Sequence, residues 1–142
     1  VVRTAWLYGL HGRNFVKTML QLASERPCLK VVADQRGCPT FSGDLAGMIG
    51  KLLAHPAQGV LHVTNAGNCT WHEFATEIVR LSGRPVPVEA ITTADMPRPA
   101  KRPAYSVLSA DRLHHLGFTM PSWQDGLQRF MKALPAVSSA VS

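Results

Sequence analysis

The fold is decided by residues 59–82, which read GVLHVTNAGNCTWHEFATEIVRLS. The β-branched residues within 59–64 predict a short strand, and the Asn- and Gly-containing segment 65–68 predicts the turn that ends it. Thr70 and Glu73 have the spacing of a capping box, which fixes the start of an amphipathic helix. A strand and a helix joined by a short turn form the repeating unit of an α/β fold.

The same alternation extends along the chain in both directions. Apolar periodicity, caps and prolines predict further strands and helices, and the proline-rich segment 92–105 predicts an extended loop. We therefore expect one α/β domain with some parallel strand pairing. The expected strands are 1–8, 29–33, 59–64 and 86–91, and the expected helices are 14–25, 44–55, 70–82, 109–116 and 122–134.

The composition is that of a folded protein with a basic surface. The 142 residues are 46% apolar and 17% charged, which excludes a disordered or coiled-coil chain, and no apolar run is long enough to span a membrane. The net charge of +6 suits an anionic partner, either a nucleic acid or a phosphorylated small molecule. Because the positive residues are scattered along the sequence, we expect no nucleic acid partner. The three cysteines form no C-x-x-C pair, so we expect reduced thiols and a cytoplasmic location.

No complete catalytic or cofactor-binding motif is present in the sequence. Gly9 and Gly12 lack the third glycine and the later acidic residue of a dinucleotide-binding turn. Neither Tyr8 nor Tyr105 is followed by a lysine four residues later, so there is no Tyr-x-x-x-Lys pair. The histidines and cysteines lack the spacing of a zinc site. We therefore expect neither a catalytic residue nor a metal site in this sequence.

Several motifs follow one another in a recognisable order along nearly the whole chain. They are RTAWLYG at 3–9, NFVKTML at 14–20, DQRGCPT at 34–40, GVLHV at 59–63, TWHEFA at 70–75, PAKRPAYS at 99–106, LGF at 116–118 and PSW at 121–123. Together they resemble the C-terminal half of the dTDP-4-dehydrorhamnose reductases, a family within the extended short-chain dehydrogenases.

The resemblance implies a fold, an activity and a cofactor. In this family an N-terminal Rossmann half binds NADPH or NADH and carries a catalytic Tyr-x-x-x-Lys motif, both upstream of the matched motifs. The expected fold is α/β, the C-terminal part of a Rossmann-like fold with a small mixed α/β substrate-binding subdomain over 1–134, followed by a flexible tail at 135–142. A full-length member reduces dTDP-4-dehydro-L-rhamnose to dTDP-L-rhamnose for polysaccharide biosynthesis. The chain alone is expected to be inactive and to bind neither NADPH nor NADH tightly.

The resemblance also implies which side chains contact the dTDP-sugar. Trp6 stands where the family has an aromatic substrate contact, and Tyr8 is expected on the same side of the opening strand. Arg102 is expected to hold the diphosphate, because a guanidinium can bind two phosphate oxygens at once. Gln35 and Thr40 flank a loop near the bound sugar nucleotide, where either could bond the sugar or the base. We expect Trp6, Gln35 and Arg102 to meet at one site. The structural alternatives are a core position for Trp6, a solvated cation for Arg102 and backbone hydrogen bonding for Gln35 and Thr40.

Other polar and aromatic residues receive different interpretations. Arg3 and Thr4 are expected to approach the nicotinamide of the cofactor in an intact enzyme. The residues interpreted as packing or ordinary surface charge are Trp71, Trp123, Arg98 and Lys101.

Two further expectations concern partners. Proteins of the same family also serve as noncatalytic regulatory subunits of methionine adenosyltransferase, which is the alternative to a dTDP-sugar reductase. The sequence opens in a strand-like run without a methionine, so we expect it to be part of a longer protein. The apolar side chains of 1–7 should then be exposed unless a partner chain, such as a second copy in a homodimer, covers them.

Overall fold

The computed structural model describes residues 1–135, and the predicted tail at 135–142 therefore lies, except for Pro135, outside the described residues. The helices begin and end close to where the sequence predicts them. They are α1 Phe15–Glu25, α2 Ser42–Leu53, α3 Trp71–Ser82, α4 Asp111–His115 and α5 Trp123–Ala133, with a short 3-10 turn at Thr93–Asp95.

The strands are shorter and more numerous than predicted. They are β1 Val2–Arg3, β2 Leu7–Tyr8, β3 Leu29–Val32, β4 Arg36–Gly37, β5 Thr40–Phe41, β6 Leu61–His62, β7 Cys69–Thr70 and β8 Val88–Ile91.

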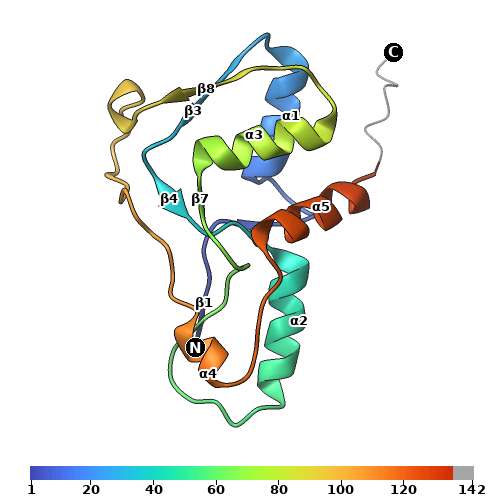
Figure 1. Ribbon diagram of the computed structural model, residues 1–142, viewed down its shortest axis with the longest axis vertical. Coiled ribbons are helices and arrows are strands. Elements are labelled where there is room, and N and C mark those ends of the chain that lie inside the picture. Colours follow the sequence, from blue (N-terminus) through green and yellow to red (C-terminus); the bar gives the residue numbers. More distant parts are fainter. Residues whose placement is uncertain (136–142) are drawn as a thin grey trace.

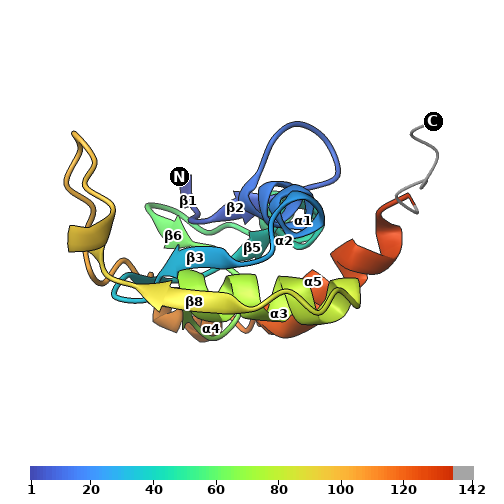
Figure 2. The same cartoon turned by 90° about the horizontal axis from the view of Figure 1, so that it is seen from above.

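Strand pairing confirms an α/β fold with parallel pairs. β1 pairs with β6, β2 with β5 and β3 with β8, all parallel, whereas β4 and β7 are antiparallel. Figure 1 shows an elongated molecule with β3, β8, α1 and α3 at one end and β1, α4 and most of α2 at the other. Seen from above, short strands lie between α1 and α2 on one side and α3, α4 and α5 on the other (Figure 2).

The single opening strand predicted for residues 1–8 is wrong. Trp6 has a φ of +48°, in the left-handed region that side-chain-bearing residues rarely adopt, and this breaks the run into β1 and β2. The two pieces pair with different strands, and the carbonyl oxygen of Trp6 accepts a hydrogen bond from the backbone N–H of Thr40 at 3.1 Å. The single strand that would have placed Trp6 and Tyr8 on the same side is therefore absent.

The helix starts follow the capping residues in the sequence. The side chain of Asn14 accepts from the backbone N–H of Lys17 at 3.1 Å, which begins α1. Thr70 and Glu73 form the predicted capping box of α3. Both helices pack their buried faces on one core, in which Phe74 and Ile78 are almost completely inaccessible. The exposed side chains of Val1, Val2 and Leu7 lie outside that core.

A buried polar hub joins α2 to α5. Both carboxylate oxygens of Asp44 accept hydrogen bonds from the guanidinium of Arg129 at 2.7 Å, and Asn65 donates a third bond at 2.8 Å. Burial alone would raise the pKa of Asp44, but the bonds from Arg129 and Asn65 outweigh it and hold that pKa below its ordinary value.

We expect Arg129→Ala to lower the free energy of unfolding by about 2 kcal/mol at neutral pH, because it strips a buried carboxylate of its charged partner. The value lies below that of a fully buried pair since the Arg129 side chain is 41% exposed and screened by solvent. Because Asp44 has a lowered pKa when folded, this stabilisation is complete above the unfolded pKa of about 3.9 and is lost as the pH falls through the folded value.

Urea unfolding at several pH values measures both effects. Arg80→Ala is the matched control, because Arg80 pairs with Glu77 on the surface with 62% of its side chain exposed. It should cost under about 1 kcal/mol. Equal losses for the two variants would contradict a special role of the Asp44–Arg129 pair.

Candidate functional site

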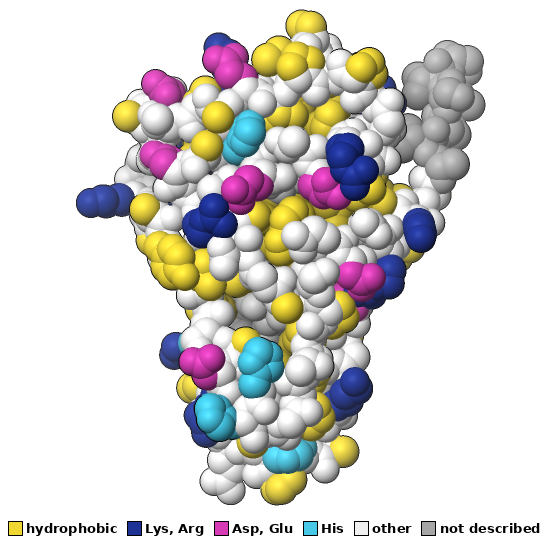
Figure 3. Space-filling view, in the orientation of Figure 1, with side chains coloured by type: hydrophobic (Ala, Val, Ile, Leu, Met, Phe, Trp, Pro, Cys, Tyr) yellow, Lys and Arg dark blue, Asp and Glu magenta, His cyan; other side chains and the backbone are white. Residues whose placement is uncertain are grey.

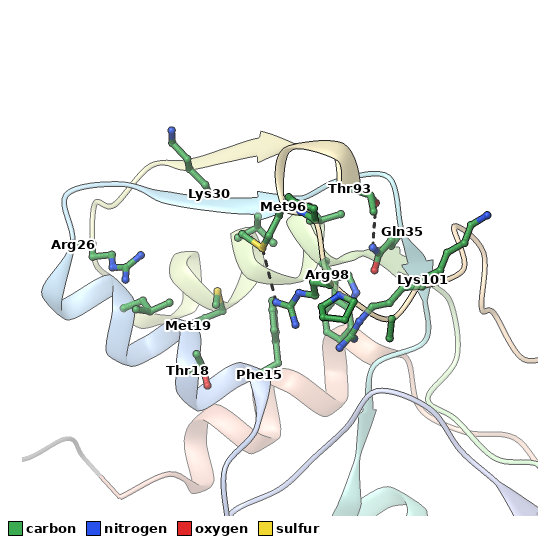
Figure 4. A pocket seen from close by; sticks show the side chains of 18 residues that line it. Phe15, Thr18, Met19, Arg26, Lys30, Gln35, Thr93, Met96, Arg98 and Lys101 are labelled. Atoms are coloured by element: carbon green, nitrogen blue, oxygen red, sulfur yellow. Dashed lines mark hydrogen bonds between the residues drawn. The ribbon is translucent and has the colours of Figure 1, made fainter.

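A cavity of about 580 Å³ lies between α1, β3, the start of α3 and the loop 92–105. Figure 4 shows its lining side chains projecting from these separate parts of the chain. The residues around it are Phe15, Thr18, Met19, Leu22, Arg26, Lys30, Val31, Val32, Gln35, Trp71, Thr93, Met96, Pro97, Arg98, Pro99, Ala100, Lys101 and Arg102.

The wall of the cavity on the side of α1 and α3 is apolar and aromatic. The ring centroids of Phe15 and Trp71 lie 4.6 Å apart, and Met19 of α1 extends the same surface. Trp6 stacks on the far side of Trp71 with a centroid distance of 3.5 Å and planes within 9° of parallel. Gly37 makes this stack fit, because a Cβ atom there would lie 2.3 Å from the Trp6 indole. Such a rigid aromatic wall suits a flat base or the apolar face of a sugar.

The charge around the cavity has a single sign. Among the residues that line it in the described part of the chain, five are Lys or Arg and none is Asp or Glu. In Figure 4 the Arg98 side chain extends over the cavity, whereas the amino groups of Lys30 and Lys101 point outward at its rim. Positive groups around an apolar hollow attract an anion, and because these side chains are exposed, solvent and salt screen part of that attraction.

Elsewhere the charges are mixed. On the face seen in Figure 3, Lys and Arg side chains alternate with Asp and Glu, so the net charge does not form one basic patch there. A nucleic acid would need a continuous basic surface.

The loop 92–105 is held at both ends by hydrogen bonds to the segment after β3. At one end the carboxylate of Asp34 accepts bonds from the backbone and side chain of Thr93. At the other end the backbone N–H of Arg36 donates to the carbonyl of Ala104 at 2.8 Å, and that of Ser106 donates to the carbonyl of Arg36 at 2.9 Å. Arg98, Lys101 and Arg102 lie between these two anchors, are exposed to solvent and line the cavity.

Two of the predicted ligand contacts line the cavity and two do not. Gln35 and Arg102 line it together, although they are far apart in the sequence. Trp6 reaches it only through Trp71, against which it stacks. Thr40 is fully buried, and its hydroxyl donates to the carbonyl of Cys38 at 3.2 Å, so it serves the backbone of its own loop.

The remaining predicted residues lie away from the cavity. Arg3 is exposed on β1, and the hydroxyl of Thr4 is buried without a hydrogen-bond partner among the described residues. Tyr8 was expected beside Trp6, but it lies in the core, 2% exposed, against Phe41 and Phe130. Trp6 stacks on Trp71, and its left-handed backbone ends the single strand on which that expectation rested.

The aromatic wall and part of the positive charge were not predicted from the sequence. Phe15 and Trp71 occupy the first positions of α1 and α3, where each lines the cavity besides packing on its neighbours. A signal existed, since two predicted helices each begin with an aromatic residue after a capping side chain. Arg98 and Lys101 were interpreted as ordinary surface charge, but the alternation of proline and cation in 97–103 marks an extended basic loop.

Other reactive side chains in the described residues offer no catalytic group for this cavity. Burial raises the pKa of Cys69 to about 12, with the nearby Glu73 adding to the effect, so it remains a neutral thiol at physiological pH. Burial also raises the pKa of Tyr8, which stays a neutral phenol in the core. Neither group lines the cavity, and neither is ionised at physiological pH.

No helix within residues 1–135 combines the length and the apolar character needed to cross a membrane.

Comparison with known proteins gives relatives along the whole described chain. The family model described as the RmlD substrate binding domain matches residues 1–135. The spore coat polysaccharide biosynthesis protein SpsK of Bacillus subtilis (strain 168) is 42% identical over 93% of this chain and 46% of its own length. A probable dTDP-4,6-dihydroxy-2-methyloxan-3-one 4-ketoreductase of Streptomyces antibioticus is 46% identical over 99% of this chain and 48% of its own.

A solved structure agrees in fold. The dTDP-4-dehydrorhamnose reductase of Bacillus anthracis str. Ames, in complex with NADP, superposes with a TM-score of 0.89 at 46% identity, covering 92% of this chain and 47% of that one. The chain thus spans about half the length of the relatives it matches.

These matches correct the identification made from the sequence. Assignment to the dTDP-4-dehydrorhamnose reductases in particular is too narrow, because a relative at 46% identity is named for a different dTDP-sugar. The match that spans residues 1–135 is to a domain family, and membership of that family does not specify which dTDP-sugar is bound. The chain belongs to the RmlD substrate binding domain family.

Proposed function

We propose that this chain supplies the nucleotide-sugar-binding part of an NAD(P)H-dependent reductase of dTDP-4-keto-6-deoxysugars. The observation that supports this most is the cavity itself, in which five cations and no carboxylate surround an aromatic wall. A dTDP-sugar carries the matching features: a diphosphate, a flat base and a deoxysugar with an apolar edge. For the substrate we propose dTDP-4-dehydro-L-rhamnose, reduced to dTDP-L-rhamnose.

The chemistry of each lining residue suits a different part of the ligand. Arg98 and Arg102 are suited to the diphosphate, since each guanidinium can donate two parallel hydrogen bonds to phosphate oxygens. Phe15 and Trp71 are suited to the base or sugar ring, because burying a flat face against an indole removes apolar surface from water. Gln35, 8% exposed between β3 and β4, offers an amide for a directional hydrogen bond.

Three helix starts among the described residues are closed by side-chain caps. The turn between β2 and α1 has two glycines, but the first turn of α1 is closed by its own cap, in which Asn14 accepts from the Lys17 N–H. The starts of α3 and α5 are likewise capped by Thr70 and Ser122. Phosphate binding at a helix start needs free N–H groups, so these three starts are poorly suited to a cofactor phosphate, whereas α2 begins without a side-chain cap.

Titration calorimetry with dTDP-L-rhamnose, dTDP and thymidine tests the proposal. We expect saturable binding of the first two and at least about 100-fold weaker binding of thymidine, because the cations act on the diphosphate. Equal affinity for dTDP and thymidine would contradict the assigned site. A tight complex with methionine adenosyltransferase and no affinity for dTDP-sugars would overturn the proposal in favour of a noncatalytic regulatory subunit.

A further inference from the structure

Asp34, Thr93 and Gln35 form a chain of hydrogen bonds at the edge of the cavity. The Oγ1 atom of Thr93 lies 2.6 Å from Oδ1 of Asp34, and the Thr93 backbone N–H lies 3.0 and 2.9 Å from the two carboxylate oxygens. The side-chain amide of Gln35 donates to the same Thr93 Oγ1 from Nε2 at 3.1 Å. Figure 4 shows the Gln35 nitrogen turned toward Thr93 and its carbonyl oxygen turned the other way.

The Asp34 carboxylate fixes which group donates the proton in each of these hydrogen bonds. An ionised carboxylate only accepts, so the single hydroxyl proton of Thr93 is donated to Asp34. The bonds from the Thr93 side chain and backbone lower the pKa of Asp34, which keeps it ionised at neutral pH. The Thr93 oxygen is left as an acceptor, and of the two ends of the Gln35 amide only the NH₂ group can donate to it.

The orientation of the Gln35 amide follows from that proton order. Reversing the amide would place its carbonyl oxygen against a hydroxyl oxygen with no proton to give, which costs a hydrogen bond. Within residues 1–135 the Gln35 Oε1 atom accepts no hydrogen bond from the protein, and Gln35 lines the cavity. The atom offered to a ligand is therefore an acceptor.

We propose that Asp34 is a positioning residue that acts through Thr93 to present Gln35 Oε1 as a hydrogen-bond acceptor, so that the site selects a ligand carrying an N–H or O–H donor there. This inference rests on the proposed function, since the ligand is a dTDP-sugar. Its donors are the N3–H of thymine and the sugar hydroxyls. Asp34 does not line this cavity, so it acts on the ligand only through Thr93 and Gln35.

Asp34→Asn tests the hydrogen-bond relay from Asp34 through Thr93 to Gln35, because it changes which groups donate protons while leaving the shape of the side chain nearly unchanged. The asparagine oxygen can still accept from the Thr93 backbone N–H, which preserves the loop anchor. Its NH₂ group instead donates to the Thr93 hydroxyl, which can then donate to Gln35 Oε1. The Gln35 amide should rotate and present its NH₂ to the cavity.

Two ratios of dissociation constants measure this rotation by calorimetry. One compares dTDP with N3-methyl-dTDP, and the other compares dTDP-L-rhamnose with dTDP. We expect the wild type to prefer the donor-bearing ligand about 10-fold in one of the two pairs, and Asp34→Asn to abolish that preference. The pair that changes identifies the base or the sugar as the donor. Thr93→Val should lose the preference as well, and Thr93→Ser should restore it.

A purely structural role for Asp34 would lower the affinity for every ligand by the same factor and leave both ratios unchanged, which would overturn the relay. If the wild type binds no dTDP compound, the proposed function fails instead. The relay is then still tested in the free protein, where the ¹⁵N side-chain amide signals of Gln35 should shift in Asp34→Asn and in Thr93→Val but not in Thr93→Ser. Unchanged Gln35 signals in both Asp34→Asn and Thr93→Val would contradict it.

Discussion

Replacing Arg98, Lys101 and Arg102 together by alanine should weaken dTDP binding by at least about 100-fold, the largest functional effect we expect. All three lie on the loop 92–105 and line the cavity. A charge-assisted hydrogen bond to phosphate contributes about 1.5–3 kcal/mol, and solvent screening at the exposed rim reduces the value for Lys101 most. Titration calorimetry at several salt concentrations measures the loss and should show a shallower salt dependence in the variant.

A matched control separates local contacts from overall charge. Arg13, Lys51 and Lys132 are exposed and do not line the cavity, so replacing all three by alanine removes the same formal charge. This control should bind dTDP within about 3-fold of the wild type at physiological salt, where distant charges are screened. Equal losses in the two triple variants would mean that dTDP responds only to net charge.

Phe74→Ala should lower the free energy of unfolding by about 3–5 kcal/mol, the largest stability effect we expect. Phe74 is 1% exposed in the core. Its ring centroid lies 5.6 Å from Tyr8, 5.5 Å from Phe15 and 5.9 Å from Trp123, so it joins α3 to α1, α5 and β2. The alanine leaves a cavity that these neighbours cannot fill without moving.

Urea unfolding measures this loss, and Phe74→Leu is its control. Leucine keeps most of the buried apolar volume and should cost about 1–1.5 kcal/mol. Because Phe15 also forms part of the aromatic wall, Phe74→Ala should weaken dTDP binding as well, which the leucine variant should largely spare. A loss below about 1 kcal/mol for the alanine variant would show that Phe74 is not a central packing residue.

Local signals in the sequence predicted the helices well. Asn14, Thr70 and Ser122 each bond to a backbone N–H three residues later, and such caps depend only on neighbouring residues. The resemblance of motifs led to an identification that the comparisons corrected, from the dTDP-4-dehydrorhamnose reductases to the RmlD substrate binding domain family. Of the three residues expected to meet at one site, Gln35 and Arg102 line the same cavity and Trp6 does not, and a ligand role for them stays a prediction.

Features that depend on distant contacts could not be predicted. The left-handed backbone at Trp6 is stabilised by stacking on Trp71 and by the close approach that Gly37 permits, and both partners lie far along the chain. Strand periodicity alone therefore placed Trp6 and Tyr8 on one face. The polar relay was also missed, because Asp34 and Thr93 are 59 residues apart and meet only when β3 pairs with β8.

The central claim is that a dTDP-sugar binds in the cavity beneath the loop 92–105. The measurement that tests it most directly is the dTDP-L-rhamnose titration followed residue by residue in ¹⁵N NMR spectra. We predict saturable shifts of the Trp71 indole N–H, the Gln35 side-chain amide and the backbone amides of Arg98 to Arg102, with the Trp123 indole unchanged. Shifts confined to residues far from the cavity, or none at saturating ligand, would contradict the account.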